Sequence, residues 1–403
     1  MRTKARHRVL LVNQYYRPDT AATAQRLTEL SEELAREHDV TVLAGRPSYG
    51  PEPAPPPVAG VVVVRVPSTA FHRSRLAGRI ANYMSYLVLA ALRGLVIGRV
   101  NVVVAATDPP VAGLVGWCLS RVHRVPFVWI VQDLHPEAAV RMGMLRSRRL
   151  VRALTALNRF LFRRTQRIVV LSESMRRRVI EAGAPAERLL IIPNWEDVAV
   201  VRPEPKDNPV SRRWGLHDRF VVMYSGNLGG GQELDICVRL AAELRDLTDV
   251  VVALIGDGTA KPHLEALSRE LGLDTVRFLP YEPRETMRYS LGAGDVFVLP
   301  LAGGLDGFVV PSKVFTIMAS GRPFVAVIEA ASEVAALIER FRCGLRVDPG
   351  DLVNLAAAAR WLHAHRDEAR AMGTRGRDAV ERLHGRDVVL PRYRQLLDEV
   401  MAG

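Results

Sequence analysis

Three glycine-containing stretches in the second half of this 403-residue chain could bind a phosphate group. Four glycines lie within Tyr224–Gln232, a short turn is expected at Ile255–Gly258, and Gly304–Lys313 ends in serine and lysine. Glycine lets the backbone approach an anion closely, and N–H groups at the start of a helix donate to phosphate oxygens. Taken singly, each stretch is also compatible with an ordinary turn between a strand and a helix.

Lys313 is the most informative side chain in these stretches. We expect Ser312 to cap the helix that follows, which places Lys313 in the first turn of that helix. The helix dipole disfavours a cation there by a few tenths of a kcal/mol, and a bound phosphate would offset this cost. The alternative is a lysine whose side chain simply faces solvent.

The first half of the chain carries a second polar group at Gln132–Glu137, where a strand is expected to end. Gln132, Asp133, His135 and Glu137 can all form hydrogen bonds or exchange protons, and α/β enzymes place active residues at strand ends. A loop held by an Asp cap, with a surface histidine, is the alternative. The chain lacks GxSxG, HExxH, DxD and GxGxxG motifs, which disfavours hydrolases, metalloenzymes and dinucleotide oxidoreductases.

The surrounding pattern predicts the elements that position these residues. Short apolar runs alternate with longer amphipathic ones, the pattern of parallel sheets wrapped by helices. In the first half the expected strands are Val9–Asn13, Val40–Ala44, Val61–Val66, Val102–Ala106, Phe127–Gln132, Ile168–Leu171 and Ile191–Pro193, with helices at Ala22–Glu37 and Glu173–Ala182. In the second half they are Phe220–Tyr224, Val250–Gly256, Val276–Leu279, Val296–Pro300 and Phe324–Val327.

The alternation breaks at Asn194–Pro209, a stretch of Pro, Asn and charged residues, and then restarts. We therefore expect an α/β protein of two Rossmann-like, doubly wound lobes, residues 1–200 and 201–385. The amphipathic segment Val388–Met401 predicts a terminal helix within residues 386–403.

Composition is that of a globular protein, with 48% apolar and 24% charged residues. The three cysteines show no CxxC spacing, so we expect neither a disulfide framework nor a zinc site, and place the protein in the cytoplasm. The apolar stretch Ile80–Gly98 is interrupted by Asn82, Ser85 and Arg93, which favours a buried helix over a bilayer span. The basic N-terminus lacks the pattern of a signal peptide.

Charge is unevenly distributed along the chain. Residues 1–202 hold 30 Arg and Lys against 15 Asp and Glu, whereas residues 203–403 hold 25 against 28. The basic first lobe indicates an anionic partner, either the inner face of the cell membrane or a pyrophosphate-bearing acceptor, contacted through segments such as Arg73–Arg79 and Arg141–Arg149. A solvated arginine-rich surface is the alternative, and nucleic acid is not expected because no recognition motif appears.

Five stretches in this order resemble glycosyltransferase family 4, whose members are retaining enzymes of the GT-B fold. The resemblance covers nearly the whole chain and is closest to WbuB-type transferases of amino-deoxy sugars such as N-acetylfucosamine. The stretches are Tyr15–Gln25, Gln132–Glu137, Ile192–Trp195, Tyr224–Leu228, and Val310–Lys313 with Met318–Pro323.

The resemblance implies two lobes facing a cleft, with residues 386–403 packed back on the first lobe. It implies retaining, metal-independent transfer, with no cofactor, from a nucleotide-diphosphate sugar, expected to be a UDP-sugar. The acceptor would be a lipid-linked glycan intermediate or a natural-product glycoside. The expected donor-binding residues are Gly226, Asn227, Leu228, Gln232, Gly256, Ser312, Lys313, Thr316 and Arg322. The expected catalytic residues are Asp133, His135 and Asp306, and those on the acceptor and sugar side are Asp19, Ala22, Thr23, Gln132 and Glu137.

The chain departs from the family pattern at several positions. Asn227 and Gln232 stand where many members carry Arg and Lys, which makes Lys313 the natural substitute cation. In the Glu-x7-Glu motif, Asp306 stands for the first glutamate. The second falls on Val314 at the strict spacing, or on Thr316, with a two-residue insertion, if the motif is anchored on Ala319–Pro323. The family's histidine falls on Gln132, three residues before His135.

Two other functions fit parts of the pattern. A sugar-nucleotide epimerase of the same fold could use Asp133, His135 and Glu137 as acid and base, and would turn over its substrate without an acceptor. The altered Glu-x7-Glu motif is also compatible with a non-catalytic nucleotide-sugar binder.

Overall fold

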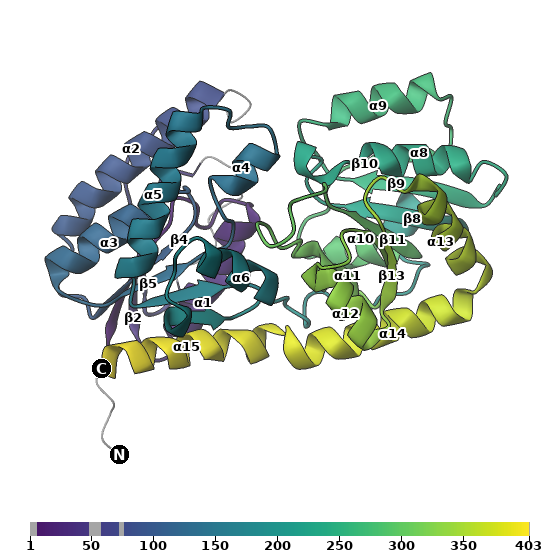
Figure 1. Cartoon of the computed structure of the whole chain (residues 1–403). Helices are drawn as coiled ribbons and strands as arrows, with labels where there is room; N and C mark the ends of the chain where they lie inside the picture. The colour runs from purple at the N-terminus through teal and green to yellow at the C-terminus, as the bar shows by residue number, and fades with distance from the viewer. Residues whose placement is uncertain (1–5, 48–57, 72–75, 403) are drawn as a thin grey trace, which may run out of the picture. The chain divides into compact units, whose positions relative to one another are not determined.

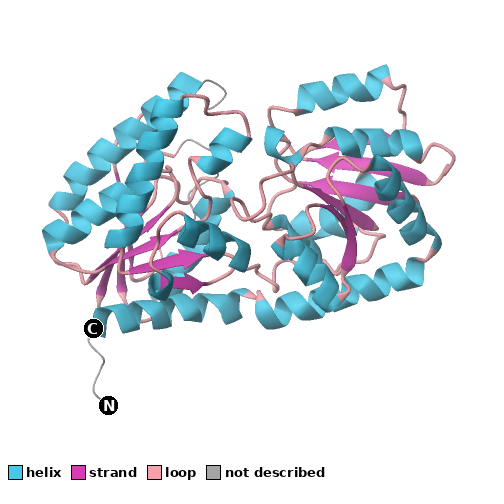
Figure 2. Ribbon diagram, viewed as in Figure 1, coloured by secondary structure: helices cyan, strands magenta, loops and turns pink. Residues whose placement is uncertain are grey.

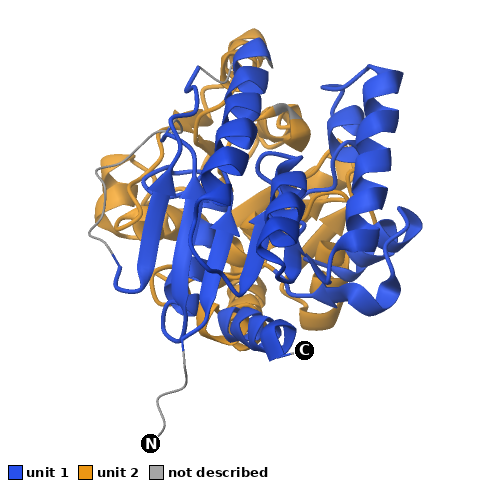
Figure 3. Cartoon of the chain, turned by 90° about the vertical axis from the view of Figure 1, so that its left-hand side faces the viewer, with its two compact units in different colours: residues 1–193, 390–403 blue, residues 194–389 orange. Residues whose placement is uncertain are grey.

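The computed structural model describes residues 6–47, 58–71 and 76–402. It divides into two compact units, residues 1–193 with 390–403, and residues 194–389 (Figure 3). The division falls at the start of the Asn194–Pro209 stretch, where the sequence pattern breaks. Each unit contains one parallel sheet with helices on both of its faces (Figure 2).

Unit 1, as far as the structure describes it, has a sheet of seven parallel strands in the order β3-β2-β1-β4-β5-β6-β7. The strands are β1 (Arg8–Val12), β2 (Asp39–Ala44), β3 (Val61–Arg65), β4 (Val102–Ala106), β5 (Phe127–Ile130), β6 (Arg167–Val170) and β7 (Leu189–Ile191). The helices are α1 (Ala22–Leu34), α2 (Leu76–Leu95), α3 (Ala112–His123), α4 (Glu137–Arg141), α5 (Arg148–Arg164) and α6 (Glu173–Glu181) (Figure 1).

Unit 2 has six parallel strands among its described residues, in the order β10-β9-β8-β11-β12-β13. They are β8 (Phe220–Ser225), β9 (Val250–Ile255), β10 (Val276–Leu279), β11 (Val296–Pro300), β12 (Phe324–Val327) and β13 (Gly344–Val347). Its helices are α7 (Pro209–Arg213), α8 (Asp235–Glu243), α9 (Lys261–Glu270), α10 (Met287–Gly292), α11 (Lys313–Ala319), α12 (Glu333–Phe341), α13 (Leu352–Ala364), α14 (Arg366–Leu383) and the start of α15 (Arg386–Ala402).

The strand order of each sheet explains where a ligand can bind. In unit 1 the chain winds outward from β1 to β3 and then returns to the other side of β1 with β4. Unit 2 does the same at β8 and β11. The loops after β1 and β4, and after β8 and β11, therefore diverge at the carboxyl ends of their strands, which is where doubly wound sheets bind their ligands.

Burial on both faces holds the central strands in place. All five residues of β4 and all six of β9 are buried, as continuous runs of Val, Ala, Leu and Ile require when helices cover both sides of a parallel sheet. The helices α8 and α9 pack on the second sheet through Leu240 and Leu264, which are fully buried in its core.

α15 crosses from one unit to the other and ends on unit 1. Arg394 forms ion pairs with Glu33 and Glu37, each at 3.2 Å, and Arg392 donates to the carbonyl oxygen of Ile191 at 2.6 Å. Because Glu33 is buried at the end of α1, these pairs hold the terminal helix on this unit.

The sequence-based expectation of a buried helix at Ile80–Gly98 is wrong for one of its faces. α2 begins at Leu76, and its residues Tyr86 and Ala90 are fully buried. Ile80, Met84 and Val88, in contrast, are each more than half exposed. Within the described residues, no helix combines the length and apolar character needed to cross a bilayer.

Candidate functional site

Two glycine loops meet at the carboxyl edge of the sheet in unit 2. Gly226 after β8 has φ 142° and Gly256 after β9 has φ 145°, a backbone region that other residues rarely adopt. The Gly226 amide donates to the Ile255 carbonyl oxygen at 2.9 Å, and a Cβ on Gly256 would collide with the Gly226 carbonyl. Both positions favour glycine by their positive φ, and at Gly256 a side chain is also excluded by the neighbouring backbone of Gly226.

Lys313, the first residue of α11, reaches across to the same loop. Its ammonium donates to the Tyr224 hydroxyl and lies 4.5 Å from the centre of that ring. A Cβ built on Gly226 would lie 2.6 Å from Lys313 Nζ, so the lysine covers this glycine directly. The alternative of a solvent-facing lysine is contradicted, since the side chain lies over the loop that we expect to bind phosphate.

The surroundings of Lys313 leave its charge without a carboxylate. In the described part of the chain it forms no ion pair, and the buried thiol of Cys237 is a second titratable neighbour beside the Tyr224 hydroxyl. Burial lowers the pKa of Lys313 to about 8 and raises the pKa of Cys237 to about 12. A partly desolvated cation that lacks an anionic partner is a suitable ligand for a phosphate.

The remaining residues of the β8 loop shape the backbone. Asn227 is exposed, and its carbonyl oxygen accepts from the Tyr224 hydroxyl at 2.8 Å. The Gln232 amide, oriented to satisfy its neighbours, donates to the carbonyl oxygens of Asn227 and Gly229 at 3.1 and 3.2 Å. Leu228 is fully buried, so only its backbone is available to a ligand.

The loop between β11 and α11 brings Asp306 and Ser312 to the same edge. The backbones of Asp306 and Val309 form an isolated β-bridge, which folds the loop back on itself. The expected cap by Ser312 is wrong: its backbone has helical angles, φ −60° and ψ −16°, and its side chain accepts no hydrogen bond from the helix. An N-cap needs an extended backbone to turn its side chain over the first N–H groups. Ser312 is therefore close to the site but is not a cap.

Thr316 lies one turn after Lys313 and is paired with a carboxylate from elsewhere. Its hydroxyl donates to Glu196, which follows the Ile192–Trp195 stretch. The other oxygen of Glu196 accepts from the Asp197 amide at 3.0 Å. The structure thus supplies a carboxylate beside the position where the family pattern has its second glutamate.

Arg322 is not brought to this site. It precedes β12, at the amino edge of the sheet, and donates to the carbonyl oxygens of Glu204 and Gly292 at 2.9 and 2.7 Å. Burial lowers its pKa, and these two bonds fix the residue as a support for the start of unit 2. We remove Arg322 from the donor-binding set.

In unit 1, Asp133 and His135 follow β5 at the carboxyl edge. Burial, together with nearby Asp108, raises the pKa of Asp133 to about 7. Burial lowers the pKa of His135, with Asp108 acting in the opposite direction and Arg79 in the same one. At neutral pH Asp133 can therefore both hold and release a proton, whereas His135 is mainly neutral.

The neighbours of this pair have different roles. The backbone amide of Gln132 donates to the Thr107 hydroxyl at 3.1 Å, which ties the β5 loop to the β4 loop. Glu137 opens α4 and accepts from the Thr155 hydroxyl at 3.4 Å. Gln132 and Glu137 thus lie on the same edge as Asp133, and Glu137 is turned toward α5.

The β1 loop supplies the other residues expected on the acceptor side. Asp19 is buried near Arg65. Burial lowers the pKa of Arg65, and the charge of Asp19 acts in the opposite direction. Ala22 and Thr23 are the first residues of α1. The N-cap residue Ala21 has only a methyl group, which cannot accept a hydrogen bond from the first N–H groups of the helix. The start of this 13-residue helix is thus able to donate to an anionic or hydroxyl group.

Sequence reasoning missed four residues at these edges. Tyr224 and Glu196 were not recognised because their partners, Lys313 and Thr316, are far away in the sequence. Asn13 and Gln14, at the end of β1, are buried, and in the described part of the chain their side-chain oxygens Oδ1 and Oε1 lack a hydrogen-bond partner. Their position directly after the first strand is the signal that could have identified them.

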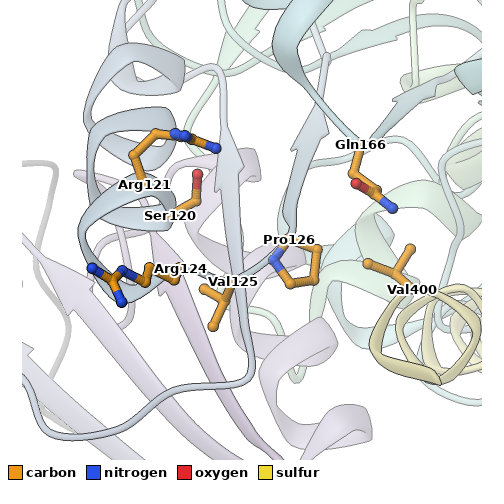
Figure 4. A pocket seen from close by; sticks show the side chains of 7 residues that line it. All are labelled: Ser120, Arg121, Arg124, Val125, Pro126, Gln166 and Val400. Carbon is orange, nitrogen blue, oxygen red and sulfur yellow. The ribbon is translucent and has the colours of Figure 1, made fainter. Parts of the chain in front are cut away.

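A pocket of about 500 Å³ in unit 1 lies elsewhere (Figure 4). It is lined by Arg121, Arg124 and Gln166, among others, and Pro126 and Gln166 directly precede β5 and β6. The pocket is therefore at the amino ends of these strands, opposite the edge that carries Asp133. We do not assign it to the candidate site.

Comparison with known proteins identifies the family. Residues 22–195 match the Glycosyl transferase 4-like domain, and residues 219–365 match Glycosyl transferases group 1. The chain is 28% identical to WcaI of Escherichia coli K12, named for colanic acid biosynthesis, over 60% of this chain and 61% of that protein. It is 29% identical to WbjE of Pseudomonas aeruginosa, named as a glycosyltransferase, over 64% and 65%. These matches span less than two thirds of the relatives' own length.

The fold comparison agrees with the sequence matches. The structure of Anabaena HepE, determined with UDP and glucose, has a TM-score of 0.74 over 98% of this chain and 100% of HepE, at 17% identity. At this identity the likeness shows the fold alone. The two predictions made from the sequence, a pair of Rossmann-like units and a place among these transferases, are confirmed. The chain belongs to glycosyltransferase family 4 and has the GT-B fold.

Proposed function

We propose that this protein transfers a sugar from a nucleotide-diphosphate sugar, with UDP as the nucleotide, to a hydroxyl group of an acceptor. The transfer retains the anomeric configuration and requires neither a metal ion nor a cofactor. The observation that carries the proposal is the position of Lys313, whose ammonium has no ion pair among the described residues and covers Gly226 at the carboxyl edge of unit 2. This position fits the diphosphate of a donor, with the expected sites Gly226, Gly256 and Asp306 around it.

The residues suggest how the reaction proceeds. The bond between the anomeric carbon and the diphosphate oxygen breaks, and its electron pair leaves with the diphosphate. Lys313 and the N–H groups of the β8 loop stabilise the charge that develops there. The acceptor oxygen bonds to the anomeric carbon on the face that the diphosphate leaves, and its proton passes to a base. Asp133, with a pKa of about 7, is the carboxyl group of unit 1 best suited to take this proton.

Glu196 supports a site for the ribose of the donor. A ribose carries two neighbouring hydroxyl groups, for which a carboxylate is a strong acceptor. Thr316 stands on α11 where the family pattern has a glutamate, so that carboxylate is missing here. Its hydroxyl donates instead to Glu196, whose carboxylate lies beside this position. We infer that Glu196 and Thr316 together bind the ribose hydroxyls.

The acceptor side is assigned to unit 1. The buried amide oxygens of Asn13 and Gln14, which lie between β1 and α1 in the chain as Asp19 does, could accept hydrogen bonds from sugar hydroxyl groups. We propose a lipid-linked glycan intermediate as the acceptor, with a natural-product glycoside as the alternative. The excess of basic residues in 1–202 supports a peripheral contact with an anionic membrane at the cytoplasmic face.

Of the two arginine-rich segments expected to make this contact, Arg141–Arg149 is largely exposed. The other, Arg73–Arg79, lies partly outside the described residues, which include Arg79 but not Arg73. Sedimentation with anionic vesicles at low and high salt tests the contact. Absence of binding at low salt would refute it and favour a small soluble acceptor.

The donor assignment is tested by thermal unfolding with UDP, GDP and dTDP and their sugars, in the presence of EDTA. A ligand at 100 times its dissociation constant adds about 2.7 kcal/mol, so a true donor raises the melting temperature measurably. If no nucleotide stabilises the protein, or if EDTA abolishes the effect, the corresponding part of the proposal fails. Conversion of the donor sugar without any acceptor would instead favour the epimerase.

A further inference from the structure

α2 carries a continuous apolar stripe on its exposed face. Ile80, Met84, Val88 and Leu92 follow one another at intervals of four residues, and Val96 continues the series just after the helix. Their exposed fractions lie between 51% and 68%. Residues four apart are neighbours on a helix surface, and each such step turns about 40° around the axis, so these exposed side chains form one continuous ridge that winds slowly along α2.

The opposite face of α2 is the one that packs on the protein. A Cβ on Gly94 would lie 2.5 Å from Leu119 of α3, and the carbonyl oxygen of Gly94 is 3.0 Å from His123 Nε2. Tyr86 is fully buried and donates from its hydroxyl to the carbonyl oxygen of Leu43 at 2.9 Å. The contacts that hold α2 on the protein are therefore made by its buried face, and the exposed apolar stripe is not needed for folding.

The helices beside the stripe carry no negative charge. α3 packs against both α2 and α5, and Trp117 of α3 meets Phe160 of α5 edge to face at 4.9 Å. None of α2, α3 and α5 contains an Asp or a Glu. Their exposed cations, with those of the adjoining turns, are Arg93, Arg99, Arg121, Arg124, Arg148, Arg149, Arg152, Arg159, Arg163 and Arg164.

The apolar stripe and the arginines together indicate the chemistry of the partner. A helix that only faces water normally pairs arginines with carboxylates three or four residues away, and these helices have none. An apolar stripe alone could cover another protein, but arginines without carboxylates on the same helices fit a surface that is apolar inside and anionic outside. A bilayer with anionic headgroups is such a surface.

We propose that α2 is a membrane-inserting element: it lies in the plane of an anionic bilayer with Ile80, Met84, Val88, Leu92 and Val96 among the acyl chains. The arginines of α3 and α5 then meet the lipid phosphates. This inference rests on the membrane contact proposed above and adds an apolar component to it. Electrostatic attraction alone weakens as salt screens the charges, whereas apolar insertion does not.

The test is sedimentation with vesicles of phosphatidylcholine and phosphatidylglycerol, at low and at high salt. We expect the wild-type protein to bind strongly at low salt and to retain a measurable part of this binding at high salt. The double variant Met84→Gln, Val88→Gln should lose the salt-resistant part and bind at least about tenfold more weakly at low salt. Val353→Gln is the matched control, since Val353 is 77% exposed in unit 2 and should leave binding unchanged.

Two further measurements separate the outcomes. Both variants should bind UDP as the wild type does, whereas Lys313→Ala should lose UDP affinity and still sediment with vesicles. If the Met84 and Val88 variant binds vesicles like the wild type, the proposal is refuted. It is equally refuted if light scattering shows a wild-type dimer that this variant converts to a monomer without any change in vesicle binding, since the stripe would then cover a second copy of the chain.

Discussion

Removal of the Lys313 ammonium should weaken nucleotide binding and slow transfer. Among the described residues, this group donates to the Tyr224 hydroxyl, lies over the Tyr224 ring and covers Gly226. A charge-assisted hydrogen bond to a phosphate contributes roughly 1.5–3 kcal/mol, and each 1.4 kcal/mol is a factor of ten. Lys313→Ala should therefore reduce both UDP affinity and turnover at least about tenfold. Because the group makes no ion pair among the described residues, the fold should tolerate its loss.

The lowered pKa of Lys313 gives this prediction a second signature. Burial brings the pKa to about 8, so the group is charged below this pH and neutral above it. A bound diphosphate favours the charged form, so affinity is highest at low pH and falls as pH rises through 8. Between pH 7 and pH 9 the charged fraction falls from about nine tenths to about one tenth, and the dissociation constant should rise about tenfold. The second ionisation of a phosphate, near pH 6, is complete over most of this range.

The assay is calorimetric titration with UDP at several pH values. The matched control is Lys313→Arg, which stays charged throughout and should bind UDP with little dependence on pH, at an affinity between those of the wild type and Lys313→Ala. Melting temperatures of each variant without ligand separate binding from folding. Equal UDP affinity of wild type and Lys313→Ala at pH 7 would refute the phosphate assignment, and a flat pH profile for the wild type would refute its electrostatic basis.

Three further changes test the neighbouring groups. Gly226→Ala places a Cβ 2.6 Å from Lys313 Nζ and should weaken UDP binding as Lys313→Ala does, with little additional loss in the double variant. Asp133→Asn should slow transfer but raise the melting temperature at pH 8 more than at pH 4. The reason is that folding raises the pKa of this carboxyl from 3.8 to about 7, so the fold loses stability as pH rises between these two values, and calorimetry at pH 4 and pH 8 checks this. Glu196→Gln should reduce the preference for UDP over 2′-deoxy-UDP at least several-fold, as measured by titration, and an unchanged preference would contradict the ribose assignment.

The sequence was sufficient for the architecture because parallel strands buried on both faces leave a strong pattern. β4, β10, β11 and β12 have the predicted bounds, and Thr107 and Pro280 mark the ends of the first two. β13 was missed because Leu345 and Val347 are the only large apolar residues in Gly344–Val347, which is too few for a strand pattern. The exposed side of α2 could not be foreseen, because an apolar helix reads as buried unless its packing partners are known.

The candidate site was only partly predictable for a related reason. Glycine loops and Lys313 could be identified because turns and cations are visible in a short stretch of sequence. Ser312 was expected to cap α11, but capping depends on backbone angles that residue type alone does not determine. Arg322 was included by proximity to Lys313 in the sequence, although the helix between them carries it to the other edge of the sheet.

We infer that contacts between distant segments compensate for the departures from the family pattern. In this proposal Lys313, held over the β8 loop by Tyr224, stands in for the charges missing at Asn227 and Gln232. Desolvation lowers the pKa of Lys313 to about 8, because burial disfavours its charged form. A bound anion would offset part of this cost. We therefore expect this phosphate site to bind a diphosphate more tightly than a monophosphate, because the second phosphate group adds negative charge that keeps Lys313 protonated. UDP should therefore bind far more tightly than UMP to the wild type, and this difference should shrink in Lys313→Ala; an equal difference in both proteins would show that the loop N–H groups alone select the diphosphate.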